Sequence, residues 1–274
     1  MSDSLYRFID SMRTHGLGMH SGELEADGQL HRYRVDGDRS GTLNGWYIAH
    51  PGEPMFGTFG SWRTGQTHNF ASKKLEEMSD ADRRALAERR SISQSLRDKY
   101  RNDQHASAAK RAEAIWQMSG SVEVHEYLRT KGVRPYGIRQ FNDRLVVPMR
   151  DASGVLWSLQ FIFPDGRKRF LTGGKKRGNY FAIGLPTHTV CVCEGFATGG
   201  SIYASTGLAT AIAFDAGNLQ PVAEALRRKF PKLKIVIAAD NDVHTPGNPG
   251  VTAAVKAAAA VGGLVALPTF EAAN

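Results

Sequence analysis

The chain has 274 residues, 41% of them apolar, and a formal net charge of +8 at pH 7. This length suffices for one large or two modest domains with buried cores, and no apolar run approaches the roughly 18 residues of a membrane span. The basic balance favours a polyanionic partner, with nucleic acid as the first candidate. The N-terminus lacks the charged-then-apolar layout of a secretory signal, so a cytoplasmic location without membrane association is expected.

The chain has only two cysteines, Cys191 and Cys193. They alternate along a predicted strand, so their side chains point to opposite faces and do not pair readily. We expect both to be small buried hydrophobes in a reducing compartment. No zinc is expected, because a structural zinc site needs about four ligands and the chain has no Cys-x-x-Cys pair.

Composition and periodicity divide the chain into four predicted domains: a β-rich unit over 1–75, a basic helical region over 76–132, a basic strand subdomain over 133–188 and an α/β domain over 189–274. The first has hairpin signals and many aromatic residues, most of them expected in its core. Trp62 beside Arg63 could instead stack on a nucleic-acid base. This unit is therefore a candidate for template contact.

The second segment is predicted to be helical, with Ser79 and Asp82 as its capping pair and a soft break around 102–103. Residues 83–111 contain nine Lys/Arg and three Asp/Glu. A solvated helix face is the favoured interpretation, and a face that follows phosphates is the alternative. A second helix over 122–131 is expected to end at Gly132.

The third segment contains predicted strands over 144–149 and 155–163 and a third that starts at Lys168. A loop then joins three glycines to Lys175, Lys176 and Arg177. Glycines permit close backbone approach and the three cations suit phosphate oxygens. An exposed flexible hairpin is the alternative interpretation of this loop.

From residue 189 the pattern alternates strand and helix. Strands are predicted over 189–193, 210–214, 235–239 and 264–267, with helices through 201–203, 219–230 and 251–261. Such βα alternation predicts a parallel sheet with right-handed crossovers. The predicted fold class is therefore α/β, with a Rossmann-like parallel sheet flanked by helices.

Acidic residues follow two of these strands: Glu194 after the first, and Asp240 and Asp242 after the third. Ligands of open α/β sheets bind beyond the carboxyl ends of the strands. Two carboxylates about 5 Å apart repel by roughly 3 kcal/mol at an effective dielectric near 20, which favours a bound cation. Carboxylate oxygens suit Mg²⁺, with Mn²⁺ as a substitute. Asp215 also follows a strand and either joins this site or shapes its turn, while ordinary capping is the alternative for the cluster.

At this point the motifs resemble a known family. Residues 194–198 (EGFAT) and 239–242 (ADND), each after an apolar strand, are similar to the Toprim domain of bacterial primases, topoisomerases and some nucleases. Residues 141–151, 165–171 and 178–184 are similar to the bacterial primase catalytic core. The combination resembles the Toprim primases of plasmids and phages.

The resemblance implies roles for nine residues. Glu194 would be a general acid/base or metal ligand, and Asp240 and Asp242 would hold Mg²⁺. Basic positions would line a groove for template and nucleotides: Arg144, Lys168, Arg169, Lys175, Lys176 and Arg177. The implied activity is synthesis of short RNA primers from NTPs on single-stranded DNA, for replication of a plasmid, phage or integrative element.

The sequence departs from the family in two respects. The cysteines of the usual zinc ribbon are absent, and the chain stops directly after its last predicted strand, where related primases continue. We therefore expect either a minimal primase or a fragment that works with a replicative helicase or a missing C-terminal module. A non-catalytic fragment that binds single-stranded DNA or a replication partner is the alternative. A Toprim nuclease or topoisomerase is disfavoured by residues 141–184.

Overall fold

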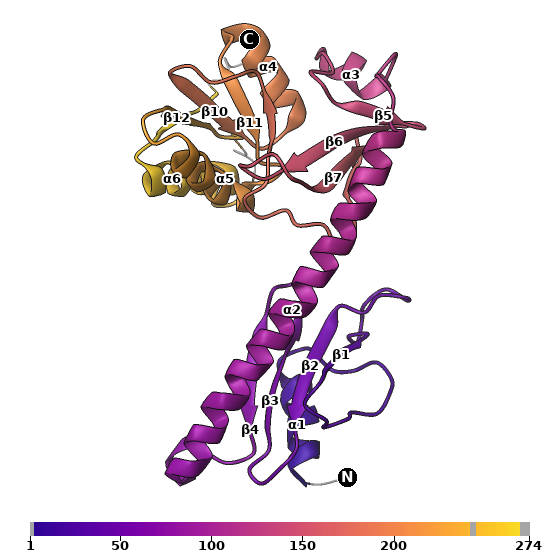
Figure 1. The fold of residues 1–274 in the computed structure, drawn as a ribbon, viewed down its shortest axis with the longest axis vertical. Coiled ribbons are helices and arrows are strands. Elements are labelled where there is room, and N and C mark those ends of the chain that lie inside the picture. The colour runs from indigo at the N-terminus through magenta and orange to yellow at the C-terminus, as the bar shows by residue number, and fades with distance from the viewer. Residues whose placement is uncertain (1–2, 242–244, 269–274) are drawn as a thin grey trace. The chain divides into compact units, whose positions relative to one another are not determined.

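The computed structural model describes residues 3–241 and 245–268. The chain divides into two compact units, Met1–Asn102 and Asp103–Asn274, and each is described by itself (Figure 1). No helix in the described ranges is long and apolar enough to cross a bilayer. The predicted four-domain division is finer than these two units and stays a prediction.

The first unit is built on a four-stranded antiparallel sheet in the order β1-β2-β3-β4. Its elements are α1 (Asp3–Thr14), β1 (Leu30–Tyr33), β2 (Gly45–His50), β3 (Phe56–Ser61), β4 (Thr67–Ala71) and a 3₁₀ turn (Leu75–Glu77). The expected β-rich character is confirmed. Helix α1 was not predicted, although its buried Phe8 and Met12 stand four residues apart, a helical spacing.

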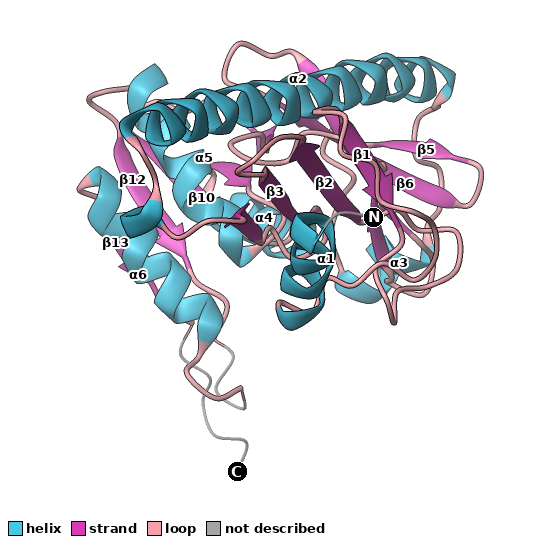
Figure 2. Cartoon of the chain, turned by 90° about the horizontal axis from the view of Figure 1, so that it is seen from below, coloured by secondary structure: helices cyan, strands magenta, loops and turns pink. Residues whose placement is uncertain are grey.

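Helices cover both faces of this sheet, α1 on one side and the first part of α2 on the other (Figure 2). The α1 side is an apolar core that includes Phe8, Met12, Tyr47 and Phe59. Phe8 makes edge contacts with the rings of Tyr47 and Phe59, at centroid distances of 6.3 and 5.6 Å. The expectation that most aromatic residues here are core residues is therefore confirmed for this side.

Helix α2 (Asp80–Met118) is one uninterrupted helix of 39 residues. Its start is a reciprocal capping pair, in which the Asp82 N–H donates to Ser79 Oγ at 3.2 Å and the Ser79 N–H donates to Asp82 Oδ2 at 3.0 Å. The predicted break around 102–103 was wrong. The helix contains no Gly or Pro, and Asn or Asp costs less than about 0.7 kcal/mol per residue in a helix.

The second unit contains a four-stranded antiparallel sheet in the order β5-β6-β7-β8. Its elements are α3 (Glu126–Lys131), β5 (Arg139–Phe141), β6 (Arg144–Arg150), β7 (Leu156–Ile162) and β8 (Lys168–Phe170). Helix α3 ends at Gly132 in the left-handed conformation, φ 62°, as predicted. One sheet face packs against Trp116 of α2, and the opposite face shares a core with the next layer.

That next layer is a five-stranded sheet in the order β13-β12-β10-β11-β9. Its elements are β9 (Phe181–Ile183), β10 (Thr189–Cys193), α4 (Phe196–Thr206), β11 (Ala209–Ile212), α5 (Ala216–Lys229), β12 (Lys234–Ala238), α6 (Pro249–Val261) and β13 (Leu264–Ala266). Strands β10 to β13 pair in parallel, which confirms the predicted α/β class. Strand β9, an antiparallel edge strand beside β11, was not predicted.

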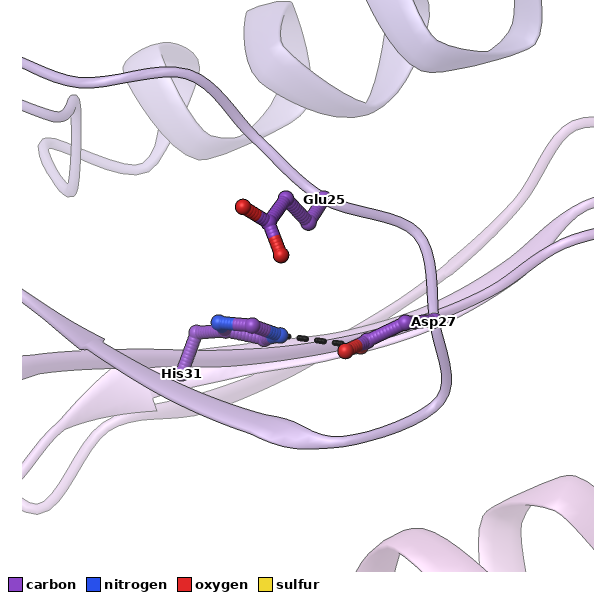
Figure 3. Close-up of side chains that lie close together, drawn as sticks. All are labelled: Glu25, Asp27 and His31. Atoms are coloured by element: carbon purple, nitrogen blue, oxygen red, sulfur yellow. Dashed lines mark hydrogen bonds and ion pairs between the residues drawn. The ribbon is translucent and has the colours of Figure 1, made fainter.

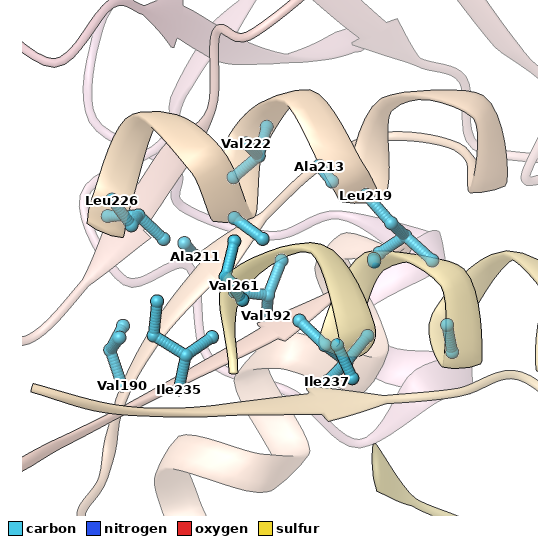
Figure 4. Packing of buried hydrophobic residues seen from close by; sticks show 14 of the residues in the cluster. Val190, Val192, Ala211, Ala213, Leu219, Val222, Leu226, Ile235, Ile237 and Val261 are labelled. Carbon is cyan, nitrogen blue, oxygen red and sulfur yellow. The ribbon is translucent and has the colours of Figure 1, made fainter. Parts of the chain in front are cut away.

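The core of this layer lies between the parallel strands and helices α5 and α6 (Figure 4). Strand side chains such as Val192 and Ile237 are fully buried there. Helix α6 contributes Ala254, Ala257 and Ala258, small residues that permit close approach. Both cysteines are buried and unpaired, as predicted.

On the other face, α4 approaches the sheet through a glycine. A Cβ built on Gly199 would lie 2.8 Å from Ile212 Cγ1 and 3.1 Å from Cys193 Sγ.

We expect Gly199→Val to lower the free energy of unfolding by about 1–3 kcal/mol, the usual cost of overpacking. Urea unfolding followed by circular dichroism measures this. Gly120→Val is the matched control, since a Cβ there meets nothing within 4 Å. Equal stability of both variants would show that α4 does not depend on this close approach.

Candidate functional site

The ends of three neighbouring parallel strands bring acidic residues to one edge of the sheet. Strand β10 pairs with β11 on one side and β12 on the other. Glu194 follows β10 directly, Asp215 comes shortly after β11 and Asp240 shortly after β12. Backbone pairing continues beyond β10, because the Phe214 N–H donates to the Glu194 carbonyl at 2.9 Å. The edge chosen from the sequence is therefore the one at which these residues meet.

Lys168 of β8 reaches this acidic edge from the other sheet. Its Nζ is 4.0 Å from where a Cβ on Gly195 would lie. Lys168 as a whole is exposed. Partial desolvation of its ammonium still lowers the pKa, and the charge of Lys131 lowers it further, while the charges of Asp240 and Glu194 raise it. Lys168 is therefore within electrostatic reach of both carboxylates. The structure brings three predicted site residues together.

The pKa of the Cys193 thiol is also affected by the negative charges at this edge. Burial raises its pKa, and the charges of Asp240 and Glu194 raise it further. Both effects disfavour the thiolate form of this side chain. The donors gathered here are carboxylate oxygens, which fit a hard divalent cation such as Mg²⁺ or Mn²⁺.

Asp215 has two partners within the protein. Its Oδ1 accepts the Asn218 N–H at 3.1 Å and so caps α5. Its Oδ2 accepts a charged hydrogen bond from Lys176. Both carboxylate oxygens are therefore engaged, which fits the turn-shaping alternative; a metal contact by Asp215 stays a prediction.

The basic loop 173–178 is anchored against α5. The Gly178 N–H donates to Asn218 Oδ1 at 2.8 Å, and Asn218 Nδ2 donates to the carbonyls of Asn179 and Ala213 at 3.0 and 2.8 Å. Asn218 is only 2% exposed. One buried amide thus joins the loop to the acidic edge, an arrangement different from a free hairpin.

The cations of this loop lie over aromatic rings. Lys175 Nζ is 4.7 Å from the ring centroid of Trp157, and Lys176 Nζ is 5.2 Å from that of Phe170. Arg177 is exposed on the same loop. Lys176 therefore stands with Lys168 on the acidic side of the second unit.

Arg144 and Arg169 lie elsewhere. Neighbouring residues of a strand point to opposite faces, so Arg169 faces away from Lys168. The guanidinium carbons of Arg144 and Arg169 are 5.5 and 5.8 Å from the ring centroid of Phe163. The predicted basic residues therefore form two groups, one at the acidic edge and one around Phe163.

Asp242 lies outside the described residues, and its part in the site stays a prediction. Two residues have roles that sequence reasoning did not predict. Asn218 was expected only to open the helix over 219–230, which was wrong, because Asp215 caps α5 and Asn218 lies in its first turn. Phe214 has φ 77°, which is rare for a bulky residue and costs about 1–3 kcal/mol, and no sequence signal indicates it.

A second group of metal-type ligands lies in the first unit, where Glu25, Asp27 and His31 have ligand atoms within 4.8 Å of one another (Figure 3). Asp27 Oδ1 is 2.8 Å from His31 Nε2 and also accepts the Gln29 N–H at 2.9 Å. Glu25 and Asp27 are exposed. These contacts stabilise the turn before β1, and we assign no cofactor to the cluster.

Comparison with known proteins agrees with this geometry. Residues 188–267 match the model of the Toprim domain. Two proteins named DNA primase TraC from Escherichia coli are similar: one is 34% identical over 89% of this chain and 24% of its own length, the other 32% identical over 96% and 19%. The chain thus spans about a quarter or less of these curated relatives.

Among solved structures, the Aquifex aeolicus primase, comprising its zinc-binding and RNA polymerase domains, aligns with 97% of this chain and 79% of its own, at 14% identity and a TM-score of 0.41. The sequence relationship is the informative one. Residues 188–267 match the Toprim domain, and the chain is similar over most of its length to part of the TraC DNA primases.

Proposed function

We propose that this chain is the catalytic part of a DNA primase and joins ribonucleotides into short primers on single-stranded DNA. The observation that carries the proposal is the meeting of Lys168 with Glu194 and Asp240 at the carboxyl edge of a Toprim sheet. The relationship to proteins named DNA primase supports it.

In this proposal Glu194, Asp240 and Asp242 hold Mg²⁺. The ion would neutralise developing charge and orient the 3′-hydroxyl and the triphosphate. Lys168 lies beside the carboxylates but cannot be a metal ligand, because its ammonium has no lone pair. It can therefore donate to a phosphate oxygen next to the ion, while Lys176 and Arg177 approach the phosphates from the anchored loop.

Arg144 and Arg169 would serve the template strand instead. They face away from Lys168 and surround the half-buried Phe163. Cations near an aromatic ring suit a single strand, whose phosphates bind the guanidinium groups while a base stacks on the ring. We propose that the reaction takes place in the cytoplasm, during replication of a plasmid, phage or integrative element, with a replicative helicase as a further partner.

One fact favours a second candidate function. The chain spans 24% or less of the relatives that it matches, so it could supply single-stranded-DNA or partner binding without competent catalysis. Strong salt-sensitive DNA binding with no NTP incorporation by the wild-type chain would select this alternative.

We expect Glu194→Gln and Asp240→Asn to abolish primer synthesis, because each removes a charge from the metal site while keeping the side-chain size. The measurement is incorporation of labelled NTPs on a single-stranded template with Mg²⁺ or Mn²⁺, and EDTA should abolish wild-type activity. Glu224→Gln is the control, a Toprim carboxylate on α5 that is hydrogen-bonded to Gln220. Full activity of either site variant would remove the carboxylates from the mechanism.

We expect Lys168→Gln to change catalysis and metal binding in opposite directions. The KM for NTPs should rise roughly 10- to 100-fold, the size of one lost hydrogen bond to a charged group. Mn²⁺ should bind more tightly in the absence of nucleotide, because a cation near the carboxylates has been removed. Steady-state kinetics and calorimetric Mn²⁺ titration measure the two effects.

Lys256→Gln on the exposed side of α6 is the matched control. Weaker Mn²⁺ binding in Lys168→Gln than in this control would show that Lys168 stabilises the carboxylates and does not compete with the ion.

A further inference from the structure

The two faces of the sheet in the first unit differ in chemistry. The α1 side is apolar. The side that faces the first part of α2 has a small apolar cluster of Phe56, Met78 and Leu86. Beside this cluster it also buries the polar residues His50, Thr58 and Ser93, which are 7%, 7% and 3% exposed. His50 Nε2 and Ser93 Oγ are 2.9 Å apart and satisfy each other. Burying polar groups stabilises a core less than burying apolar ones, so the polar part of this face needs a further explanation.

A cavity of about 210 Å³ lies on this side. Thr58, Thr67 and Asn69 of β3 and β4 form one wall, and α2 forms the other with Arg90, Ser93 and Arg97 among its residues. Every described residue that lines it is polar, two are arginines, and none is acidic. The cavity is smaller than the roughly 300 Å³ at which small-molecule pockets begin. It therefore suits a single anionic group better than a whole nucleotide.

The sequence positions these groups by ordinary periodicities. Positions 90, 93 and 97 lie on one face of a helix, and Thr58 is paired across the strands with Asn69. Arg97 Nη1 donates to Thr67 Oγ1 at 3.2 Å, and its guanidinium carbon lies 5.2 Å from the ring centroid of Trp46. Arg97 is thus held at the cavity wall.

An aromatic stack continues from the cavity along α2. Tyr100, three residues after Arg97, stacks on Trp62 with a centroid distance of 6.0 Å and an interplanar angle of 24°. The Arg32 guanidinium carbon lies 5.4 Å from the Tyr100 ring centroid and 6.0 Å from that of Trp62. Both rings are half-buried. A pocket for an anionic group therefore adjoins rings and a cation.

We propose that this cavity binds a backbone phosphate of single-stranded DNA, with Arg90 and Arg97 as its cationic ligands and the Trp62–Tyr100 stack beside the adjoining base. Two guanidinium groups and the side-chain amides of Asn69 and Gln94 are donors that match phosphate oxygens. Sequence-independent strand binding combines such a basic groove with aromatic platforms. The site would be a second nucleic-acid contact, independent of the Toprim carboxylates. Its DNA ligand rests on the proposed function, since the template of a primase is single-stranded.

The test is equilibrium binding of a fluorescein-labelled oligothymidine 12-mer to the full chain in EDTA, measured by anisotropy across a salt series. We expect Arg90→Gln with Arg97→Gln to weaken binding roughly 10- to 100-fold. The slope of log affinity against log salt should become shallower by about 1.4, since each lost phosphate contact on a single strand removes about 0.7.

The matched control is Arg83→Gln with Arg84→Gln, which removes the same charge from exposed positions of the same helix. An equal loss in both double variants would reduce the site to general electrostatic attraction and overturn the proposal. If Arg97→Gln lowers the midpoint temperature of unfolding, the single variant Arg90→Gln is used to test the proposal. Its expected change in the salt slope is about 0.7.

Two further arms identify the ligand and separate this proposal from primer synthesis. Inorganic phosphate and ATP are added as competitors, and full displacement of the oligomer by ATP at equal phosphate concentration would assign a nucleotide site and overturn the strand assignment. The same binding series is run on Glu194→Gln with Asp240→Asn protein. If the arginine variants still bind the oligomer more weakly than their control in that background, the result supports strand binding at the cavity, even where primer synthesis fails.

Discussion

Carboxylates that follow neighbouring parallel strands repel one another, and the second unit is arranged around this repulsion. Glu194 and Asp240 come to one edge because β10 and β12 are adjacent. At about 5 Å and an effective dielectric near 20, two such charges cost roughly 3 kcal/mol. The antiparallel sheet and the loop after it place positive charges beside this edge, which reduces the repulsion. Lys168 lies near both carboxylates, and Lys176 pairs with Asp215. The acidic edge and the basic strands are thus two parts of one electrostatic arrangement.

The two sheets must stay in contact for this balance to hold. They share a core in which Leu145 and Ile162 of the antiparallel sheet join Ile212 of the parallel sheet. Phe214 extends the contact at the site, where its ring meets Phe170 in an edge contact at 6.2 Å. Its left-handed backbone also turns the chain toward Asp215. Directly after this turn, Asn218 holds the basic loop and α5 together through its side-chain amide.

Much of this site could be predicted from the sequence, because its parts are local. Short β-branched runs predicted β10 at its observed bounds, and the position of Glu194 and Asp240 directly after strands predicted that both would lie at one edge of the sheet. The division of the basic residues was also accessible, since alternation along β8 separates Lys168 from Arg169. What could not be predicted depends on distant contacts. Lys176 pairs with Asp215, 39 residues away, and β9 forms only because β11 offers it an edge.

The errors have equally physical origins. The break in α2 was predicted because Asn102 and Asp103 are weak helix formers. The helix continues through them because the stretch contains no Gly or Pro. Helix α1 was overlooked because the hairpin signals dominated the first 75 residues. The polar cavity of the first unit gives no signal in the sequence, because Thr58, Asn69 and Arg97 become neighbours only when a hairpin and a helix pack together.

The buried thiols have a consequence for how this protein experiences oxidants. Oxidation and alkylation both require a thiolate, and burial raises the pKa of Cys191 and of Cys193 alike. The negative charges beside Cys193 disfavour its thiolate further, so its reactivity toward oxidants and alkylating reagents is reduced. These are the only cysteines in the chain. Thiol-directed reagents should therefore modify the two cysteines slowly while the protein is folded and rapidly once it unfolds, so the rate of thiol labelling would follow the opening of the sheet.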